Sequence, residues 1–249
     1  MIGMSVVPLG VGDAFSALYY SACLAVECDG AWLLVDCPHP IRKMMREASR
    51  AASVQLDIDN VQAIALTHLH ADHASGLEDF AYYSHFFLQR KTVLATHPQV
   101  AENLWSGHLS ASMGQLRGMP GMPLQTKQLD DYMNLVLLDE HASVQIGPFT
   151  LECRKTIHPI PTFAFRIHAA GRSLGCSADT SFDPALLAWL LEADTVVHET
   201  NHGIHTPYET LAALPESTRK KLRLIHYPDT FDLQASVITP LREGVRYDV

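Results

Sequence analysis

Three histidines and an aspartate fall within six consecutive positions of the stretch THLHADHASG, which begins at Thr67. They are His68, His70, Asp72 and His73, and imidazole and carboxylate groups are the ligands that zinc and similar divalent ions prefer. If the chain enters the stretch extended, His68 and His70 point the same way and can share one metal. A turn then directs Asp72 and His73 to a second position. The pattern therefore predicts a metal-binding loop.

The residues before this loop must form the elements that position it. The run VQAIALTH (61–68) is predicted to be a buried strand that leads directly into the histidines. Three strands are predicted upstream, in the runs SVVPLG, SACLAVEC and AWLLVDC. The pair Asp29-Gly30 indicates a hairpin between the last two. A helix is expected to begin at Pro40, because proline favours the first turn.

Downstream of the loop, strands are predicted again over 92–97, 134–139, 142–158, 162–179 and 195–200. Helices are predicted over 98–105, 184–194 and 208–223, and LIHYPDT (224–230) is expected to end the ordered core. Two sets of strands, each followed by helices, predict a layered α/β sandwich with a duplicated plan. Because no linker-like segment is visible, a single domain over residues 1–249 is expected.

One segment, residues 106–127, breaks this pattern. Its sequence, SGHLSASMGQLRGMPGMPLQTK, is rich in Gly, Ser and Met and has no hydrophobic period. Long irregular inserts in compact domains are often functional lids, and others are disordered. We expect a lid-like insert here, with a mobile surface loop as the alternative.

Composition limits the classes of function. The chain has 249 residues and a formal net charge of −9, which disfavours extended nucleic acid as a partner. The five cysteines form no C-x-x-C pair and are expected to be buried thiols. Neither a signal peptide nor an apolar run long enough to cross a membrane is visible, so a cytoplasmic protein without membrane contacts is expected.

The histidine loop resembles that of the metallo-β-lactamase superfamily, whose members add an isolated histidine, a bridging aspartate and a final histidine. Here His158 follows ECRKTI, Asp179 follows RSLGCSA and His226 follows LRLI. The resemblance implies an αββα sandwich of the metallo-β-lactamase type with two divalent ions, zinc being expected and manganese or iron the alternatives. It also implies three sets of ligands: His68, His70 and His158 for one ion, Asp72, His73 and His226 for the other, and Asp179 bridging both.

A second resemblance selects one branch of this superfamily. The stretch TVVHETNHGIHT is similar to two signatures of the ribonuclease Z-like phosphodiesterases, HEAT and HST, and the opening PLGVGDAFS is similar to theirs as well. The first signature is one residue shorter here, and the second lacks its serine. The resemblance implies that Glu199 orients His205, which would donate a proton to the departing oxygen, beside a catalytic Asp72.

Two divalent ions can generate a bridging hydroxide at neutral pH and stabilise the oxygens of a phosphodiester during displacement. We therefore expect a binuclear phosphodiesterase. The insert holds only Arg117 and Lys127 as basic residues, which favours a small substrate such as a 3′,5′-cyclic nucleotide. The chain resembles small phosphodiesterases of that kind, including those that phages use against cyclic nucleotide signals, and a homodimer is expected. The alternatives are a ribonuclease Z-like RNA 3′-processing endonuclease and a lactone or thioester hydrolase.

Overall fold

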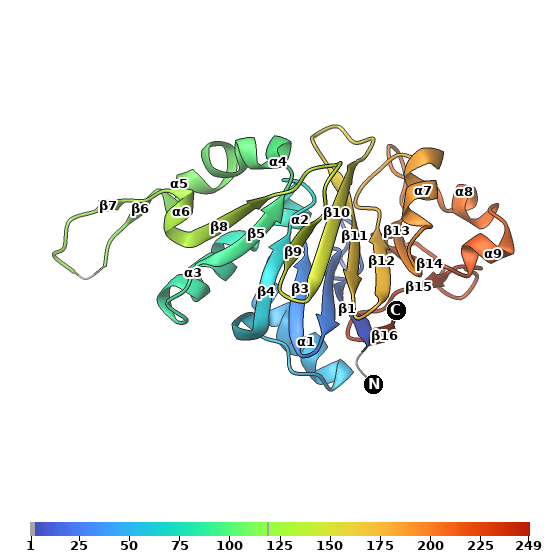
Figure 1. The fold of residues 1–249 in the computed structure, drawn as a ribbon, viewed down its shortest axis with the longest axis horizontal. Coiled ribbons are helices and arrows are strands. Elements are labelled where there is room, and N and C mark those ends of the chain that lie inside the picture. Colours follow the sequence, from blue (N-terminus) through green and yellow to red (C-terminus); the bar gives the residue numbers. More distant parts are fainter. Residues whose placement is uncertain (1–2, 119) are drawn as a thin grey trace.

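Residues 3–118 and 120–249 are described by the computed structural model, in which two seven-stranded sheets face each other (Figure 1). The first sheet has the strand order β16-β1-β2-β3-β4-β5-β8. Its strands are β1 (Met4–Gly10), β2 (Cys23–Cys28), β3 (Ala31–Val35), β4 (Val61–Ala65), β5 (Thr92–Thr96), β8 (Met133–Leu137) and β16 (Tyr247–Asp248). β2 and β3 form the predicted hairpin, and Asp29 and Gly30 both have positive φ at its turn.

The second sheet repeats this plan with the strand order β15-β14-β13-β12-β11-β10-β9. Its strands are β9 (Val144–Ile146), β10 (Phe149–Lys155), β11 (Phe163–Ala169), β12 (Arg172–Cys176), β13 (Thr195–Glu199), β14 (Leu222–Ile225) and β15 (Thr239–Pro240). Each sheet has an antiparallel half and a parallel half, and this repetition agrees with the duplicated plan that the sequence predicts.

The parallel halves determine where functional loops can meet. β3, β4 and β5 run parallel in the first sheet, and β12, β13 and β14 run parallel in the second. β10 runs in the same direction as β12, because both are antiparallel to β11. The carboxyl ends of parallel strands lie at one edge of a sheet, so the loops that follow these strands gather there.

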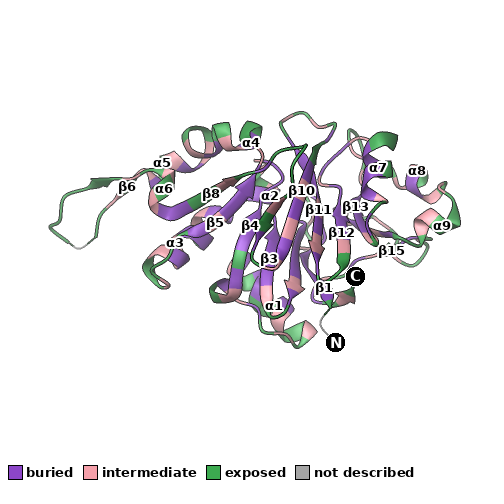
Figure 2. Ribbon diagram, viewed as in Figure 1, coloured by how far each residue is buried: buried purple, intermediate pink, exposed green. Residues whose placement is uncertain are grey.

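Helices flank the outer faces and the edges of both sheets. They are α1 (Ile41–Ala52), α2 (Ala71–Ala74), α3 (Leu77–Phe86), α4 (Pro98–Asn103), α5 (Ser110–Met113), α6 (Leu129–Tyr132), α7 (Pro184–Leu190), α8 (Tyr208–Ala212) and α9 (Glu216–Arg219), with short turns η1 (Ile58–Asn60) and η2 (Leu104–Leu109). α1 buries Met44 and Met45 toward the first sheet, and Leu190 of α7 contacts Gly175 of β12. One hydrophobic cluster runs through both sheets (Figure 2). These layers confirm the predicted αββα sandwich.

Three parts of the chain differ from the sequence-based expectation. Helix α3 was not predicted, because its apolar residues do not keep to one side. The segment 208–223, predicted to be helical, forms two short helices on either side of Pro215, and its last two residues begin β14. The ordered core also continues past residue 230: β16 pairs with β1, and Ile238 and Leu241 are buried. Strands of two residues are too short to show a period, which explains this error.

The insert at 106–127 has more local structure than its composition indicates. η2 continues α4, α5 follows, and β6 (Gln115–Leu116) pairs with β7 (Gln125–Thr126) in a hairpin. Met119 lies outside the described residues. The hairpin projects from the end of the molecule opposite α8 and α9 (Figure 1), and most of its described residues are exposed (Figure 2).

Two further observations concern the whole described chain. All five cysteines are buried and unpaired, as expected. Within residues 3–118 and 120–249, no helix combines the length and the apolar character needed to span a bilayer.

Candidate metal centre and active site

Four ligand-type side chains meet at the shared edge of the sheets. His68 and His70 follow β4, His158 follows β10 and Asp179 follows β12. His70 Nδ1 lies 3.1 Å from both His68 Nε2 and His158 Nε2, and Asp179 Oδ2 lies 3.9 Å from His68 Nε2. One atom from each side chain falls within 4.8 Å of the others, a spacing that suits a single ion.

A second set lies directly beside the first. Asp72 and His73 belong to α2, and His226 follows β14. Asp72 Oδ2 lies 3.2 Å from His73 Nε2 and 3.3 Å from His226 Nε2. Asp179 lies 3.4 Å from His73 Nε2 through Oδ1 and 3.6 Å from His226 Nε2 through Oδ2. The carboxylate of Asp179 therefore faces both sets, and the seven residues singled out in the sequence lie together.

Asp36 is a residue of this site that the sequence analysis missed. It directly follows β3 in the left-handed conformation, with φ of 66°, and is buried. Its Oδ1 accepts hydrogen bonds from Thr67 N (2.8 Å) and Thr67 Oγ1 (2.9 Å), and its Oδ2 lies 2.8 Å from His73 Nδ1. Thr67 Oγ1 in turn lies 2.9 Å from His68 Nδ1. Asp36 therefore orients one histidine of each set, as outer partners of metal ligands do.

The residues present fit divalent metal ions. His73 Nε2 is buried without a hydrogen-bond partner, although it faces two carboxylates. Buried polar atoms are almost always paired, so an unpaired nitrogen in this place fits a metal bond. His226 and Ala178 have φ of 58° and 52°, a strained conformation for residues with side chains. Such strain concentrates at functional sites.

The electrostatics favour cations. Burial lowers the pKa of His68, and it lowers the pKa of His158 to about 4, so both imidazoles are neutral and able to bind metal. Burial alone would raise the pKa of Asp72, but the hydrogen bond with His226 and the nearby imidazole of His73 outweigh it and hold the pKa below its usual range. The ionised carboxylates thus place negative charge where positive ions would bind.

Glu199 and His205 form a separate pair beside these ligands. Glu199 ends β13 and is buried, whereas His205 lies six residues later at the surface of the cavity. His205 Nδ1 lies 3.0 Å from Glu199 Oε1 and 3.8 Å from Asp179 Oδ2. Burial lowers the pKa of His205, but the hydrogen bond and charge of Glu199 outweigh this effect and raise it. Glu199 is further oriented by Thr180, whose N donates to Oε1.

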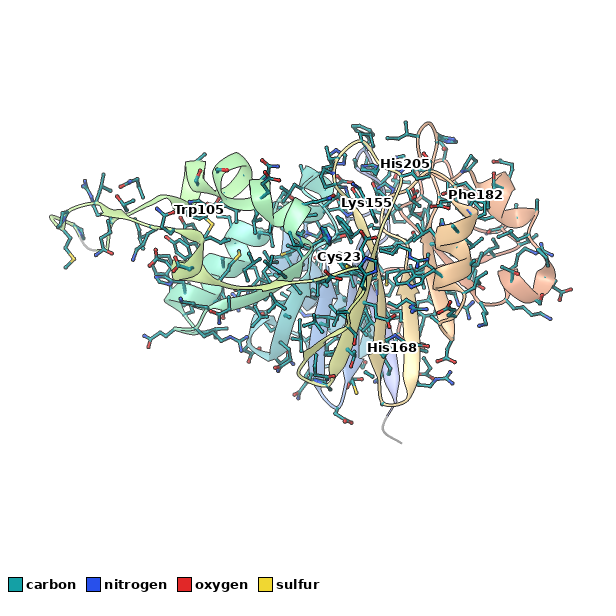
Figure 3. All side chains as sticks on the ribbon, turned by 45° about the horizontal axis from the view of Figure 1, so that its top comes forward. Cys23, Trp105, Lys155, His168, Phe182 and His205 are labelled. Carbon is teal, nitrogen blue, oxygen red and sulfur yellow. The ribbon has the colours of Figure 1, made fainter. Side chains whose placement is uncertain are left out.

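A cavity of about 280 Å³ opens onto the site. It is lined by Ala14, Phe15, His70, Ala71, Asp72, His158, Asp179, Asn201, Ile204, His205 and His226. Figure 3 shows His205 at this edge of the molecule, whereas His168 of β11 lies at the opposite end. Ligand cavities usually have volumes of about 300–1,000 Å³, so this one suits a small molecule.

Solved structures place the fold in a known class. A metallo-β-lactamase fold protein, YhfI from Bacillus subtilis, superposes with a TM-score of 0.77 at 16% identity over 100% of both chains. A diphosphatase of the PhnP family gives 0.74 at 14% identity, covering 99% of this chain and 98% of that one. The short form of human tRNase Z gives 0.70 at 20% identity over 98% of both. The fold is therefore the metallo-β-lactamase fold, as the sequence resemblance implies.

Sequence relatives are more specific. A family model described as "Anti-Pycsar protein Apyc1" matches residues 4–240. Two proteins with that description are 28% identical in Bacillus phage BSP38 and 30% identical in Bacillus phage vB_BsuM-Goe3, each match covering 90% of this chain and 89% of the relative. A third, from Paenibacillus harenae, is 29% identical over 90% of both chains. The chain therefore belongs to the Anti-Pycsar protein Apyc1 family.

Proposed function

We propose that this protein is a metal-dependent phosphodiesterase that hydrolyses a small phosphodiester, with a 3′,5′-cyclic nucleotide as the favoured substrate. The observation that carries the proposal is the Glu199–His205 pair beside the seven candidate ligands, with a separation of 3.0 Å. Hydrolysis of a diester expels an alkoxide, which needs a proton. A carboxylate-oriented histidine next to the metal ligands can supply it.

Each part of the site has a defined task in this reaction. His68, His70 and His158 would hold one ion, and Asp72, His73 and His226 the other, with Asp179 shared between them. When bound, two divalent ions, with zinc as the expected metal, supply Lewis acidity toward the phosphodiester oxygens and an activated water.

The proton donor depends on the orientation of one imidazole. Because Nδ1 of His205 lies against Glu199, Nε2 is the ring nitrogen that remains to donate the proton to the departing oxygen. Asp72 remains ionised, and it accepts from His226 and orients that ring.

A compact substrate agrees with the size and charge of the molecule. The cavity of about 280 Å³ is at the small end of ligand sites, and the chain has a net charge of −9. Of the two basic residues in the insert, Lys127 lies 3.9 Å from Asp131, so its charge is partly neutralised. An RNA chain, whose affinity depends on phosphate neutralisation, has little positive charge to bind here.

The descriptions of related proteins support the same chemistry. The Apyc1 relatives include phage proteins named for an anti-Pycsar activity, which agrees with a small signal molecule as substrate. One neighbour of the same fold is described as a diphosphatase, another as a tRNase Z, and a third as yeast PDE1, with a TM-score of 0.72 at 13% identity. Their shared fold accommodates chemistry at phosphate.

We also propose a homodimer in which the insert covers the site of a second copy. The β6–β7 hairpin contributes none of the described lining residues of the cavity in its own chain and projects away from the body (Figure 1). Met122 and Leu124 are 49% and 57% exposed on it. A lid formed by this hairpin therefore requires a partner subunit, and its apolar side chains would be buried there.

A panel of substrates tests the function. Protein loaded with zinc or manganese is assayed against 3′,5′-cyclic nucleotides, linear dinucleotides, precursor transfer RNA and lactones. We expect cyclic nucleotides to give the highest kcat/KM and the products to be nucleoside monophosphates. Efficient cleavage of precursor RNA with no action on cyclic nucleotides would assign the endonuclease alternative, and preferred lactone hydrolysis would exclude phosphodiester chemistry.

A further inference from the structure

An exposed aromatic side chain stands at the mouth of the active-site cavity. Phe15 follows β1 and is 93% exposed, more than any other large hydrophobic residue among those described. It nevertheless lines the same cavity as His70, Asp72 and His205. Single exposed apolar residues are ordinary on protein surfaces, but one in the wall of a catalytic cavity faces whatever enters it.

The loop that carries Phe15 is held in place by hydrogen bonds. Phe15 N donates to Asp13 Oδ1 at 3.0 Å. Asp229 accepts from Ser16 Oγ, from Ala17 N at 2.8 Å and from Leu18 N at 3.4 Å. The backbone on both sides of Phe15 is therefore fixed, and less conformational entropy is lost when a ligand packs on the ring.

Hydrogen bonds also connect this loop to the segments that carry the candidate metal ligand His226 and the Glu199–His205 pair. Asp229 lies three residues after the candidate ligand His226. On the other side, Asn201 Nδ2 donates to Asp13 Oδ2 at 3.0 Å, and Asn201 lies two residues after Glu199. The position of Phe15 is thus tied to both the metal ligands and the proton donor. A molecule whose phosphate lies among the ligands would extend toward the phenyl ring.

We infer that Phe15 is a substrate-binding residue on which the nucleobase of the substrate stacks. This inference rests on the proposed function. A cyclic nucleotide combines an anionic phosphate, which suits the metal ligands, with a flat base that has two apolar faces. Stacking of a base on an aromatic side chain contributes about 1–3 kcal/mol and tolerates every base, because each has a π face. Stacking on Phe15 therefore predicts that the protein discriminates only weakly among nucleobases.

The first experiment compares two substrates in Phe15→Ala and in the matched control Leu18→Ala. Leu18 lies on the same loop, is 68% exposed and does not line the cavity. The substrates are a 3′,5′-cyclic nucleotide and the 3′,5′-cyclic phosphate of 1-O-methylribose, which has no base. We expect Phe15→Ala to lower the ratio of their kcat/KM values about 5- to 150-fold, mainly through KM, and Leu18→Ala to leave it unchanged.

Conservative variants separate stacking from general apolar contact. Phe15→Tyr and Phe15→Trp are expected to keep the kcat/KM ratio of the two substrates at the value of the unmodified protein. Phe15→Leu is expected to lower that ratio nearly as far as Phe15→Ala does. Phe15→Trp also provides a binding measurement: indole fluorescence should be quenched by a non-hydrolysable cyclic nucleotide phosphorothioate. Leu18→Trp serves as its control, and the abasic cyclic phosphate should leave both emissions unchanged.

The results distinguish this inference from the proposed function. If the unmodified protein does not hydrolyse cyclic nucleotides, the proposed function is wrong. If it does, and Phe15→Ala leaves both KM and the substrate ratio unchanged, the stacking role is wrong and the phosphodiesterase stands. A change in oligomeric state of Phe15→Ala on size-exclusion chromatography, with the ratio unchanged, would assign Phe15 to a contact between subunits instead.

Discussion

In the proposed reaction, His205 gives a proton to the departing oxygen, and it belongs to neither of the two ligand sets that contain Asp179. We expect His205→Ala to retain bound metal and to lose about 10²–10⁴-fold in rate, the usual range for general acid catalysis. The loss should shrink for a substrate with a nitrophenolate leaving group, which scarcely needs protonation. Steady-state kinetics on both substrates, with elemental analysis of the variant, check this.

Equal losses on the two substrates would contradict the assignment. Glu199→Gln provides a matched control, because it preserves the shape of the side chain but removes the negative charge beside His205 Nδ1. It should show the same dependence on the leaving group.

Asp179 faces both sets of candidate metal ligands: its oxygens lie 3.4 Å and 3.6 Å from nitrogens of the second set, and Oδ2 lies 3.9 Å from His68 Nε2. We expect Asp179→Ala to lower the content of both ions and to abolish activity. Elemental analysis after dialysis against a chelator checks the metal content. Two bound ions and full activity in this variant would exclude the proposed centre.

Single residues also mark the limit of sequence-based prediction. His68, His70, Asp72 and His73 are recognisable because their types and spacing occur together in one loop. Asp36 is equally close to the site, 2.8 Å from His73, but it stands alone after a strand, as many structural aspartates do. The only signal that could have revealed it was its place at the end of a strand parallel to β4.

At the scale of elements, Gly76 closes the histidine loop against a neighbouring segment. Gly76 N donates to Cys37 O and Cys37 N donates to His73 O, each at 2.8 Å. A Cβ added to Gly76 would lie 2.4 Å from Pro38 O, and this clash could be relieved only by a shift of the backbone. We expect Gly76→Ala to lower the free energy of unfolding by about 1–3 kcal/mol, the usual cost of overpacking, and to weaken metal retention. Urea denaturation and elemental analysis measure these effects.

Gly107→Ala is the control for this prediction. Gly107 is exposed in η2, and an added Cβ would lie 3.4 Å from its nearest neighbour, Asn103 Cβ. Alanine is favoured over glycine in helices, so this variant should be at least as stable as the original protein. Equal destabilisation by the two substitutions would show that close packing at Gly76 is not the cause.

Elements with a clear hydrophobic period could be predicted from the sequence, whereas others depended on tertiary contacts. The strands β2, β3, β4, β5, β12 and β13 fall within the runs predicted for them, and β1 begins one residue before its run. Helix α3 was missed because Tyr82, Tyr83 and Phe86 place aromatic rings outside the one face that is buried, so its apolar residues show no clear helical period. β16 exists only because β1 offers a free edge to the last residues, which no local pattern reveals.

At the scale of the whole molecule, the insert is the least predictable part. Its sequence has no period, yet Met113 is buried and Tyr132 Oη donates to Met113 O, so its base is fixed to the body. The hairpin beyond it extends outward from this base (Figure 1). The sequence predicts a lid here, and the copy whose site this hairpin covers in the proposed dimer depends on contacts that leave no local signal in one chain.

Excision of the hairpin tests the lid and the dimer together. Lys127 N donates to Gly114 O at 3.0 Å, so residues 115–126 can be replaced by Asn-Gly, a turn that joins paired strands, without disturbing α5. We expect kcat/KM for cyclic nucleotides to fall by up to about 10²-fold, the scale seen when a substrate loses its positioning. Hydrolysis of a small chromogenic diester should be spared, because that substrate needs only the metal ligands and has a good leaving group.

The tip of the hairpin distinguishes the two parts of this prediction. Met122→Ser with Leu124→Ser keeps the length of the hairpin but removes the apolar side chains that a partner subunit would bury. Light scattering should then show more monomer, together with weaker hydrolysis of cyclic nucleotides. If the excised protein hydrolyses cyclic nucleotides as the intact protein does, the insert is not a lid. If it loses that activity while both proteins are monomeric, the hairpin must close over its own site, and a large movement from the position in Figure 1 would be required.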